Sequence, residues 1–140
     1  MDIYFACSIT GGRDDEPYYQ VIVDTLLTEG HNVPTAHLSR PEVLSLENVV
    51  DPVDVYMRDM EWIEQCHALV AEVSTPSHGV GYEISSALNK GKPVLCLHHE
   101  NCRVSKMLTG NTQSGIVVRS YHQKADIPQL IMEFLDALQP

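Results

Sequence analysis

Two acidic residues, Asp59 and Glu83, lie in segments that could bring them to one reaction centre. Glu83 ends the segment PSHGVGYE (76–83), in which two closely spaced glycines follow an apolar run and lead into a helical pattern. A carboxylate there could simply complement the positive end of a helix dipole. It could also attack an anomeric carbon while a second carboxylate handles the proton of the leaving group. Such a pair cleaves O-glycosidic or N-glycosidic bonds.

The second carboxylate comes from the segment MRDMEWIEQ (57–65), which has helical periodicity. Asp59 and Glu61 are two residues apart, so they point in different directions from a helix. We therefore expect only one of them to face a pocket and the other to be solvated.

A glycine-containing turn in ACSITGGRDDE (6–16) supplies a possible anion site. Glycines allow backbone N–H groups to approach an anion, and an arginine can pair with it. The segment is neither the dinucleotide fingerprint G-x-G-x-x-G nor a Walker loop. On its own it is equally consistent with a tight turn that binds nothing. Its candidate ligands are Gly11, Gly12 and Arg13.

A second strand-to-helix turn carries Ser77 and Gly79, whose hydroxyl and N–H groups could reach the same anion. Two such turns at one edge favour a site for phosphate or a sugar phosphate. No Cys or His spacing matches a metal site, so we expect no metal.

The chain alternates strand and helix patterns over its whole length, 1–140, and reads as one domain. We predict strands at 2–7, 31–37, 67–73, 92–99 and 115–121. We predict helices at 17–30, 51–66, 81–91, 103–110 and 127–139, with a loop and helical turn at 38–50. This order predicts a doubly wound α/β fold, a five-stranded parallel sheet with helices on both faces. The carboxyl ends of its strands would gather the candidate segments at one edge.

The composition excludes several classes of partner. Nine basic and nineteen acidic residues give a net charge of −10, which argues against general binding of nucleic acid or anionic membranes. No apolar run approaches the length of a transmembrane helix, and the N-terminus lacks a signal-peptide pattern. The four cysteines form no C-x-x-C pair. We expect a cytoplasmic protein, with a nuclear location equally compatible.

Three motifs together resemble the 2′-deoxynucleoside 5′-phosphate N-hydrolase family, a branch of the nucleoside 2-deoxyribosyltransferase superfamily. They are IYFACSITGGR (3–13), DMEW (59–62) and VAEVSTPSHGVGYE (70–83). The resemblance implies a flavodoxin-like fold, a homodimer and no cofactor. It implies hydrolysis of a deoxynucleoside monophosphate to free base and 2-deoxyribose 5-phosphate.

The resemblance also assigns roles to residues. Glu83 matches the nucleophile that forms a covalent glycosyl-enzyme, and Asp59 matches the acid that assists the departing base or orients the sugar. Tyr4 would line the pocket, and His37 would lie near the base or sugar. Two phosphate loops are implied, which contain Ser8, Gly12 and Arg13 in the first and Ser77 and Gly79 in the second. Ser105 resembles a serine lent to the neighbouring subunit's phosphate, so that each active site would be shared.

The sequence departs from the family pattern at Cys7 and Thr10, where many members have glycine and arginine. This puts strict specificity for monophosphates in doubt. Three alternatives stay open: a deoxyribosyltransferase acting on unphosphorylated nucleosides, a hydrolase of ribonucleoside monophosphates, and a nucleotide-binding module without activity. Ile9, a bulky residue beside the first loop, could crowd a 2′-hydroxyl and so disfavour the ribonucleotide alternative.

Overall fold

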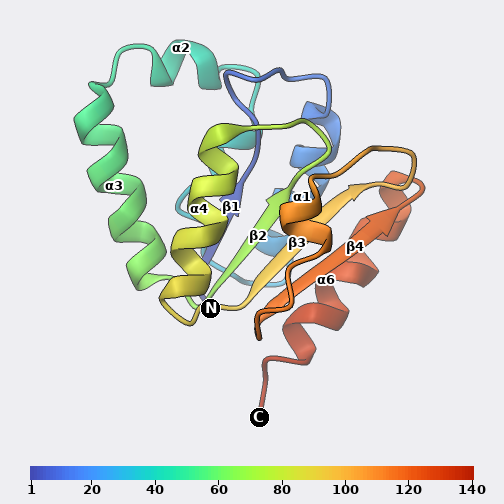
Figure 1. Cartoon of the computed structure of the whole chain (residues 1–140). Helices are drawn as coiled ribbons and strands as arrows, with labels where there is room; N and C mark the ends of the chain where they lie inside the picture. Colours follow the sequence, from blue (N-terminus) through green and yellow to red (C-terminus); the bar gives the residue numbers. More distant parts are fainter.

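The computed structural model describes all 140 residues, and a parallel sheet of four strands forms its centre (Figure 1). The strands β1 (Ile3–Ala6), β2 (Ala68–Glu72), β3 (Val94–His99) and β4 (Ile116–Tyr121) lie side by side in that order. β1 and β2 are buried along their whole length. Continuous apolar strands of this kind are typical of a parallel sheet covered on both faces.

The strand predicted at 31–37 does not form, and only one isolated bridge, between Asp2 and Asn32, is found there. The N–H of Ile3 donates to the carbonyl of Asn32 at 2.8 Å, but pairing goes no further. Pro34 has no N–H to donate, and the chain then turns into the 3₁₀ helix η1 (Ala36–Ser39). The prediction of a doubly wound parallel sheet is confirmed, with four strands in place of five.

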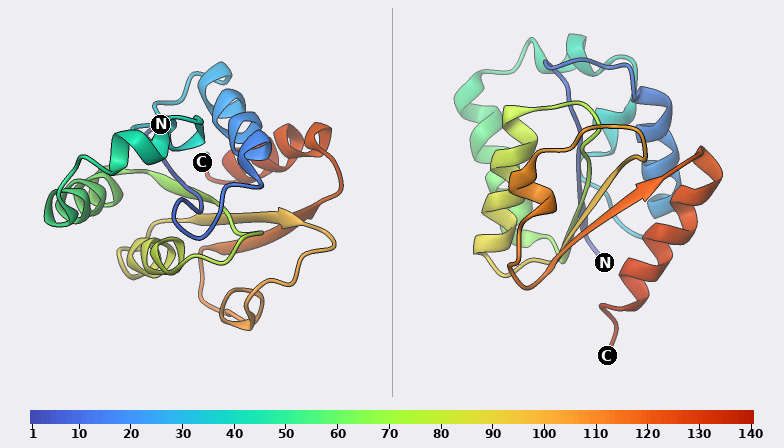
Figure 2. Two further views of the ribbon diagram at one scale, coloured as in Figure 1. Left: turned by 90° about the horizontal axis from the view of Figure 1, so that it is seen from above. Right: turned by 45° about the vertical axis from the view of Figure 1, so that its right-hand side comes forward.

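Helices cover both faces of the sheet (Figure 2). On one side lie α1 (Glu16–Thr28) and α6 (Ile127–Asp136), and on the other lie α3 (Pro52–Gln65) and α4 (His78–Asn89). The short elements are α2 (Val43–Glu47), α5 (Lys106–Thr109) and the 3₁₀ helix η2 (Lys124–Asp126). None of the helices is long and apolar enough to cross a membrane.

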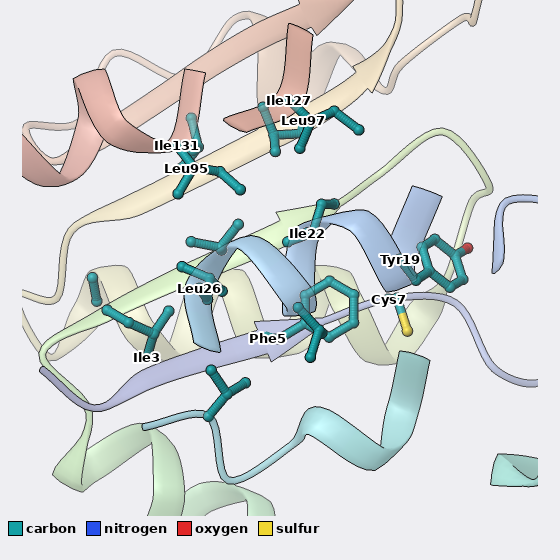
Figure 3. Close-up of a cluster of buried hydrophobic side chains, with 14 of the residues drawn as sticks. Ile3, Phe5, Cys7, Tyr19, Ile22, Leu26, Leu95, Leu97, Ile127 and Ile131 are labelled. Atoms are coloured by element: carbon teal, nitrogen blue, oxygen red, sulfur yellow. The ribbon is translucent and has the colours of Figure 1, made fainter. Parts of the chain in front are cut away.

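Successive side chains of β1 point to opposite faces of the sheet, and the buried side chains form one cluster on each face. Ile3 and Phe5 pack with α1 and α6 in a cluster of 19 residues, part of which Figure 3 shows. Tyr4 and Ala6 point to the opposite face and belong to a cluster of 12 residues under α3 and α4. Tyr4 is therefore fixed on the face of the sheet against which α3 and α4 pack.

Helix α4 begins at His78, three residues before the predicted start at residue 81. The Ser77 side chain caps it by accepting a hydrogen bond from the N–H of Val80 at 3.3 Å. Gly79 and Gly81 do not prevent the helix from beginning before residue 81, because the cap at Ser77 stabilises its first turn. Glu83 consequently lies in the second turn of α4 rather than at its first residues.

The carboxyl ends of the strands, the loop after β1, helix α2 and the start of α4 meet at the same end of the molecule (Figure 1). This is the edge at which open parallel sheets bind ligands. The candidate segments 6–16 and 76–83 both lie there.

Candidate active site

A cavity of about 660 Å³ opens at this edge, between the loop after β1, the chain around α2, and helices α3 and α4. Asp59 and Glu83 both line it, and so do Ile9, Ser77 and Gly79. The structure thus brings together five of the residues proposed from the sequence. Its volume is in the range of sites for small molecules.

Glu83 is partly buried and is held by Tyr4, whose hydroxyl donates a hydrogen bond to Oε1 at 2.9 Å. Tyr4 itself is completely buried in β1 and does not line the cavity wall. Burial raises the pKa of Glu83 to about 8, the Tyr4 hydrogen bond lowers it, and the negative charge of Asp59 raises it. Glu83 therefore exchanges a proton near neutral pH, as a group with a catalytic task commonly does.

Asp59 reaches the cavity from the second turn of α3, whereas Glu61 is exposed and accepts a hydrogen bond from Gln65. One of the two acids thus faces the cavity and the other faces solvent. The Nε of Arg58 donates to Asp59 Oδ1 at 2.9 Å. Burial raises the pKa of Asp59 above its usual value, and the Arg58 guanidinium opposes that rise.

Arg58 and Glu47 form a polar cluster that no motif in the sequence indicated. Nη2 of Arg58 donates to Glu47 Oε1 at 3.1 Å, and His37 Nε2 lies 2.8 Å from the same oxygen. The Arg58 guanidinium also stacks over the Trp62 ring at 4.8 Å. Burial raises the pKa of Glu47, but His37 and Arg58 outweigh it, so the net shift is downward. His37 lies behind Glu47 and does not itself line the cavity.

The two glycine-containing loops pack directly against each other. A Cβ atom at Gly11 would lie 2.7 Å from the Pro76 carbonyl oxygen, so only glycine fits this contact. Gly12 has a φ of 132°, which residues with a side chain rarely adopt. Ser8 is completely buried under the loop, and its Oγ has no hydrogen-bond partner.

Arg13 points away from the cavity toward α1. Its guanidinium pairs with Glu16 at 2.9 Å, donates to the carbonyl of Arg40 at 3.1 Å and lies over the Tyr19 ring. In this arrangement the first loop offers backbone groups to an anion in the cavity. The predicted contact between Arg13 and a phosphate stays a prediction.

Ser77 and Gly79 occupy the N-cap and the first turn of α4, where free N–H groups favour an anion. Ser105 lies elsewhere, at the N-cap of α5, where it accepts from the N–H of Met107. It lines a second cavity of about 420 Å³, which includes Ser77 in its wall. No group of three or more His, Cys, Asp or Glu side chains is arranged around a metal-sized site.

Part of the wall of the large cavity is apolar, and no motif in the sequence predicted this wall. The residues that form this wall are Leu44, Val50, Val55, Tyr56 and Met60. Two of them, Leu44 and Val50, come from the segment 38–50, whose pattern was ambiguous. An apolar wall in the same cavity as two carboxylates suits the flat face of a nucleobase, since ring faces bury well against aliphatic side chains.

Comparison with known proteins shows the family of this chain. The family model described as nucleoside 2-deoxyribosyltransferase matches residues 3–127. This chain belongs to that family. The match includes the first loop, Asp59, and the segment from Ser77 to Glu83.

Relatives within the family carry more specific names. A Methanococcoides burtonii protein, provisionally named 2′-deoxynucleoside 5′-phosphate N-hydrolase 1, is 43% identical over 85% of this chain and 98% of its own length. A Tetraodon nigroviridis protein named 5-hydroxymethyl-dUMP N-hydrolase is 38% identical and covers 96% of each chain. The structure of Clostridium botulinum CMP N-glycosidase, at 18% identity, superposes with a TM-score of 0.74 over 96% of this chain and 99% of that one. This last likeness supports the fold.

Proposed function

We propose that this enzyme hydrolyses the N-glycosidic bond of 2′-deoxynucleoside 5′-monophosphates, giving a free base and 2-deoxyribose 5-phosphate. The observation that carries the proposal is the placement of Glu83 and Asp59, from two different helices, in the wall of one cavity that begins at a helix N-terminus. The names of its relatives, N-hydrolases of deoxynucleotides, support the same reaction.

Glu83 is the proposed nucleophile. Its carboxylate attacks C1′, the bond from C1′ to the base nitrogen breaks, and the electron pair leaves with the base. Water then attacks C1′ of the glycosyl ester and gives a proton to the Asp59 carboxylate, which releases 2-deoxyribose 5-phosphate and the free carboxylate of Glu83. The Tyr4 hydroxyl, 2.9 Å from Glu83 Oε1, holds the side chain in place and stabilises its charged form.

Asp59 is the proposed partner that protonates the departing base or orients the sugar. Burial raises its pKa, which is the direction that favours a proton donor, and the hydrogen bond from Arg58 fixes the orientation of its side chain. The base would lie against the apolar wall formed around α2 and α3.

The phosphate is proposed to bind between the two loops, at the N–H groups of the first turn of α4 and the hydroxyl of Ser77. Ser8 and the backbone of Gly11 and Gly12 would close the other side. Binding energy from the unreactive phosphate would then place C1′ opposite Glu83.

We further propose a homodimer in which Ser105 of one subunit completes the phosphate site of the other. Large apolar side chains are exposed beside both cavities, among them Val49 (84%), Met57 (62%), Tyr82 (55%) and Met107 (81%). Clusters of this kind mark protein contacts more often than solvated surface.

A cytoplasmic or nuclear location fits the four cysteines, all of which are free.

The test is to incubate the protein with the four deoxynucleoside monophosphates and the matching nucleosides and to follow free base by chromatography. We expect base release from monophosphates, and a loss on the order of a thousandfold or more in Glu83→Gln. Glu61→Gln, on the exposed side of α3, is the matched control and should retain activity.

A deoxyribosyltransferase is the second candidate, because the matching family model carries that description. It would use the same glutamate with a second base as acceptor in place of water. Product that forms only when an acceptor base is added, from nucleosides as readily as from monophosphates, would favour it and contradict the hydrolase.

A further inference from the structure

Beneath the second glycine-containing loop lies a buried carboxyl group that the proposed reaction does not use. Glu72 is the last residue of β2 and is completely buried. Its Oε1 accepts a hydrogen bond from the N–H of Ser74 at 2.7 Å, and its Oε2 has no partner. A buried carboxyl in this position restrains the chain as it leaves the strand.

A second acid restrains the same loop from the other side. Asp15 occupies the N-cap position of α1, but its side chain makes no capping hydrogen bond. It accepts a hydrogen bond from the Thr75 hydroxyl at 2.8 Å instead and lies 3.1 Å from His99 Nε2. The N–H of His99 in turn donates to Ser74 Oγ at 2.9 Å.

These contacts act on the proposed phosphate site through the short segment that follows. Ser74 and Thr75 lead directly to Pro76, whose carbonyl packs on Gly11, and to Ser77, which caps α4. Glu72 and Asp15 therefore set where the first turn of α4 meets the loop after β1.

The charges around Glu72 disfavour its ionised form. The titratable groups that face it are Cys7 after β1, Asp15 and Tyr19 on the α1 side, and Tyr121 on β4. None of these four groups is cationic. The two groups nearby that can carry a positive charge are paired with acids, His99 with Asp15 and Arg13 with Glu16. Burial raises the pKa of Glu72 to about 7, the Ser74 hydrogen bond lowers it, and the charge of Asp15 raises it.

We propose that Glu72 is a proton-linked positioning residue for the 5′-phosphate end of the site: it holds the loop 74–77 through the Ser74 N–H, and its ionisation adds a negative charge at this edge that weakens anion binding. The inference rests on the proposed function for the identity of the anion. The direction follows from charge, since a bound phosphate and an ionised Glu72 at the same edge disfavour each other. By linkage, anion affinity falls as the pH rises and Glu72 loses its proton.

Calorimetric binding of 2-deoxyribose 5-phosphate at pH 6 and pH 8.5 tests this without any turnover. The variants are Glu72→Gln, which keeps an acceptor for the Ser74 N–H, and Glu61→Gln as the exposed control. The ligand and Glu83 titrate equally in all three proteins, so the comparison isolates Glu72. Between the two pH values we expect wild type to lose about three- to tenfold more affinity than Glu72→Gln. Glu61→Gln should follow wild type.

Glu72→Leu, which lacks the acceptor, should bind weakly at both pH values. If that variant does not fold, the Gln comparison alone decides. Equal pH dependence in wild type and Glu72→Gln, or no binding of the sugar phosphate at either pH, would overturn the inference. The proposed function fails separately: a pH-linked difference in binding without base release sinks the hydrolase and leaves the role of Glu72 intact. Base release without a pH-linked difference in binding would support the hydrolase and overturn the proposed role of Glu72.

Discussion

At the scale of single residues, the pair Tyr4 and Glu83 shows how one side chain sets the working range of another. Burial and the charge of Asp59 keep the proton on Glu83, whereas the hydrogen bond from Tyr4 favours its release. Only the carboxylate attacks C1′, so kcat/KM should rise with pH as Glu83 ionises, around a pKa of about 8 in the free enzyme.

Replacing Tyr4 with Phe should move this rise to higher pH, because the interaction that lowers the pKa of Glu83 is lost while the ring still fills the core. A hydrogen bond to a charged group contributes about 1.5–3 kcal/mol, so kcat/KM at pH 7 should fall roughly ten- to a hundredfold. A pH profile of kcat/KM measures both effects. Tyr18→Phe, on the opposite face of the sheet, should leave the profile in place. A fall in activity in Tyr4→Phe with no displacement of the profile would contradict this account.

At the scale of elements, the start of α4 combines a structural and a binding task at Ser77. Its hydroxyl caps the helix, and the cap of α3 at Asp51 offers a matched comparison, since it accepts from the N–H of Val53 at 2.9 Å. Ser77→Ala and Asp51→Ala should each lower the free energy of unfolding by about 1 kcal/mol. Only Ser77→Ala should also raise KM for monophosphates, by about tenfold or more, because a hydrogen bond to a charged phosphate is lost.

Urea unfolding and steady-state kinetics on the same two variants separate these effects. The KM for unphosphorylated nucleosides should not change in Ser77→Ala, since the missing contact is to the phosphate. A similar rise in KM in both variants would mean that helix stability alone controls binding.

The elements themselves were largely predictable, because their periodicity is local. The helix at 51–66 and the strands at 67–73 and 92–99 appear within a few residues of their predicted bounds. At two of the boundaries that differ from the prediction, a single interaction decides. The cap at Ser77 extends α4 toward its N-terminus, and the missing donor at Pro34 stops the expected strand.

The site was predictable only where its residues belong to a motif. Asp59 and Glu83 stand in distinctive segments, and the fold places both in one cavity. Glu47, by contrast, reaches the site through a long-range contact with Arg58, and nothing in its neighbouring sequence indicates that contact. The apolar wall was missed for the same reason, because aliphatic side chains carry no chemical signal until packing places them.

At the scale of the whole molecule, the proposed sharing of active sites can be tested by mixing two impaired proteins. In a heterodimer of Glu83→Gln and Ser105→Ala subunits, one site carries both defects. The other combines an intact Glu83 with an intact Ser105 from its partner. After subunit exchange, a 1:1 mixture should therefore gain about a quarter of wild-type activity, since half of the dimers are mixed and each has one good site.

The gain should depend on exchange, so it should grow with incubation time and be absent when the proteins are mixed just before the assay. Sedimentation velocity on the same samples checks that the protein is a dimer. If Ser105 acts within its own subunit, every site in the mixture lacks either Glu83 or Ser105, and activity stays at the mean of the two variants. That outcome would limit the contribution of Ser105 to its own subunit, in which it caps α5 by accepting from the N–H of Met107.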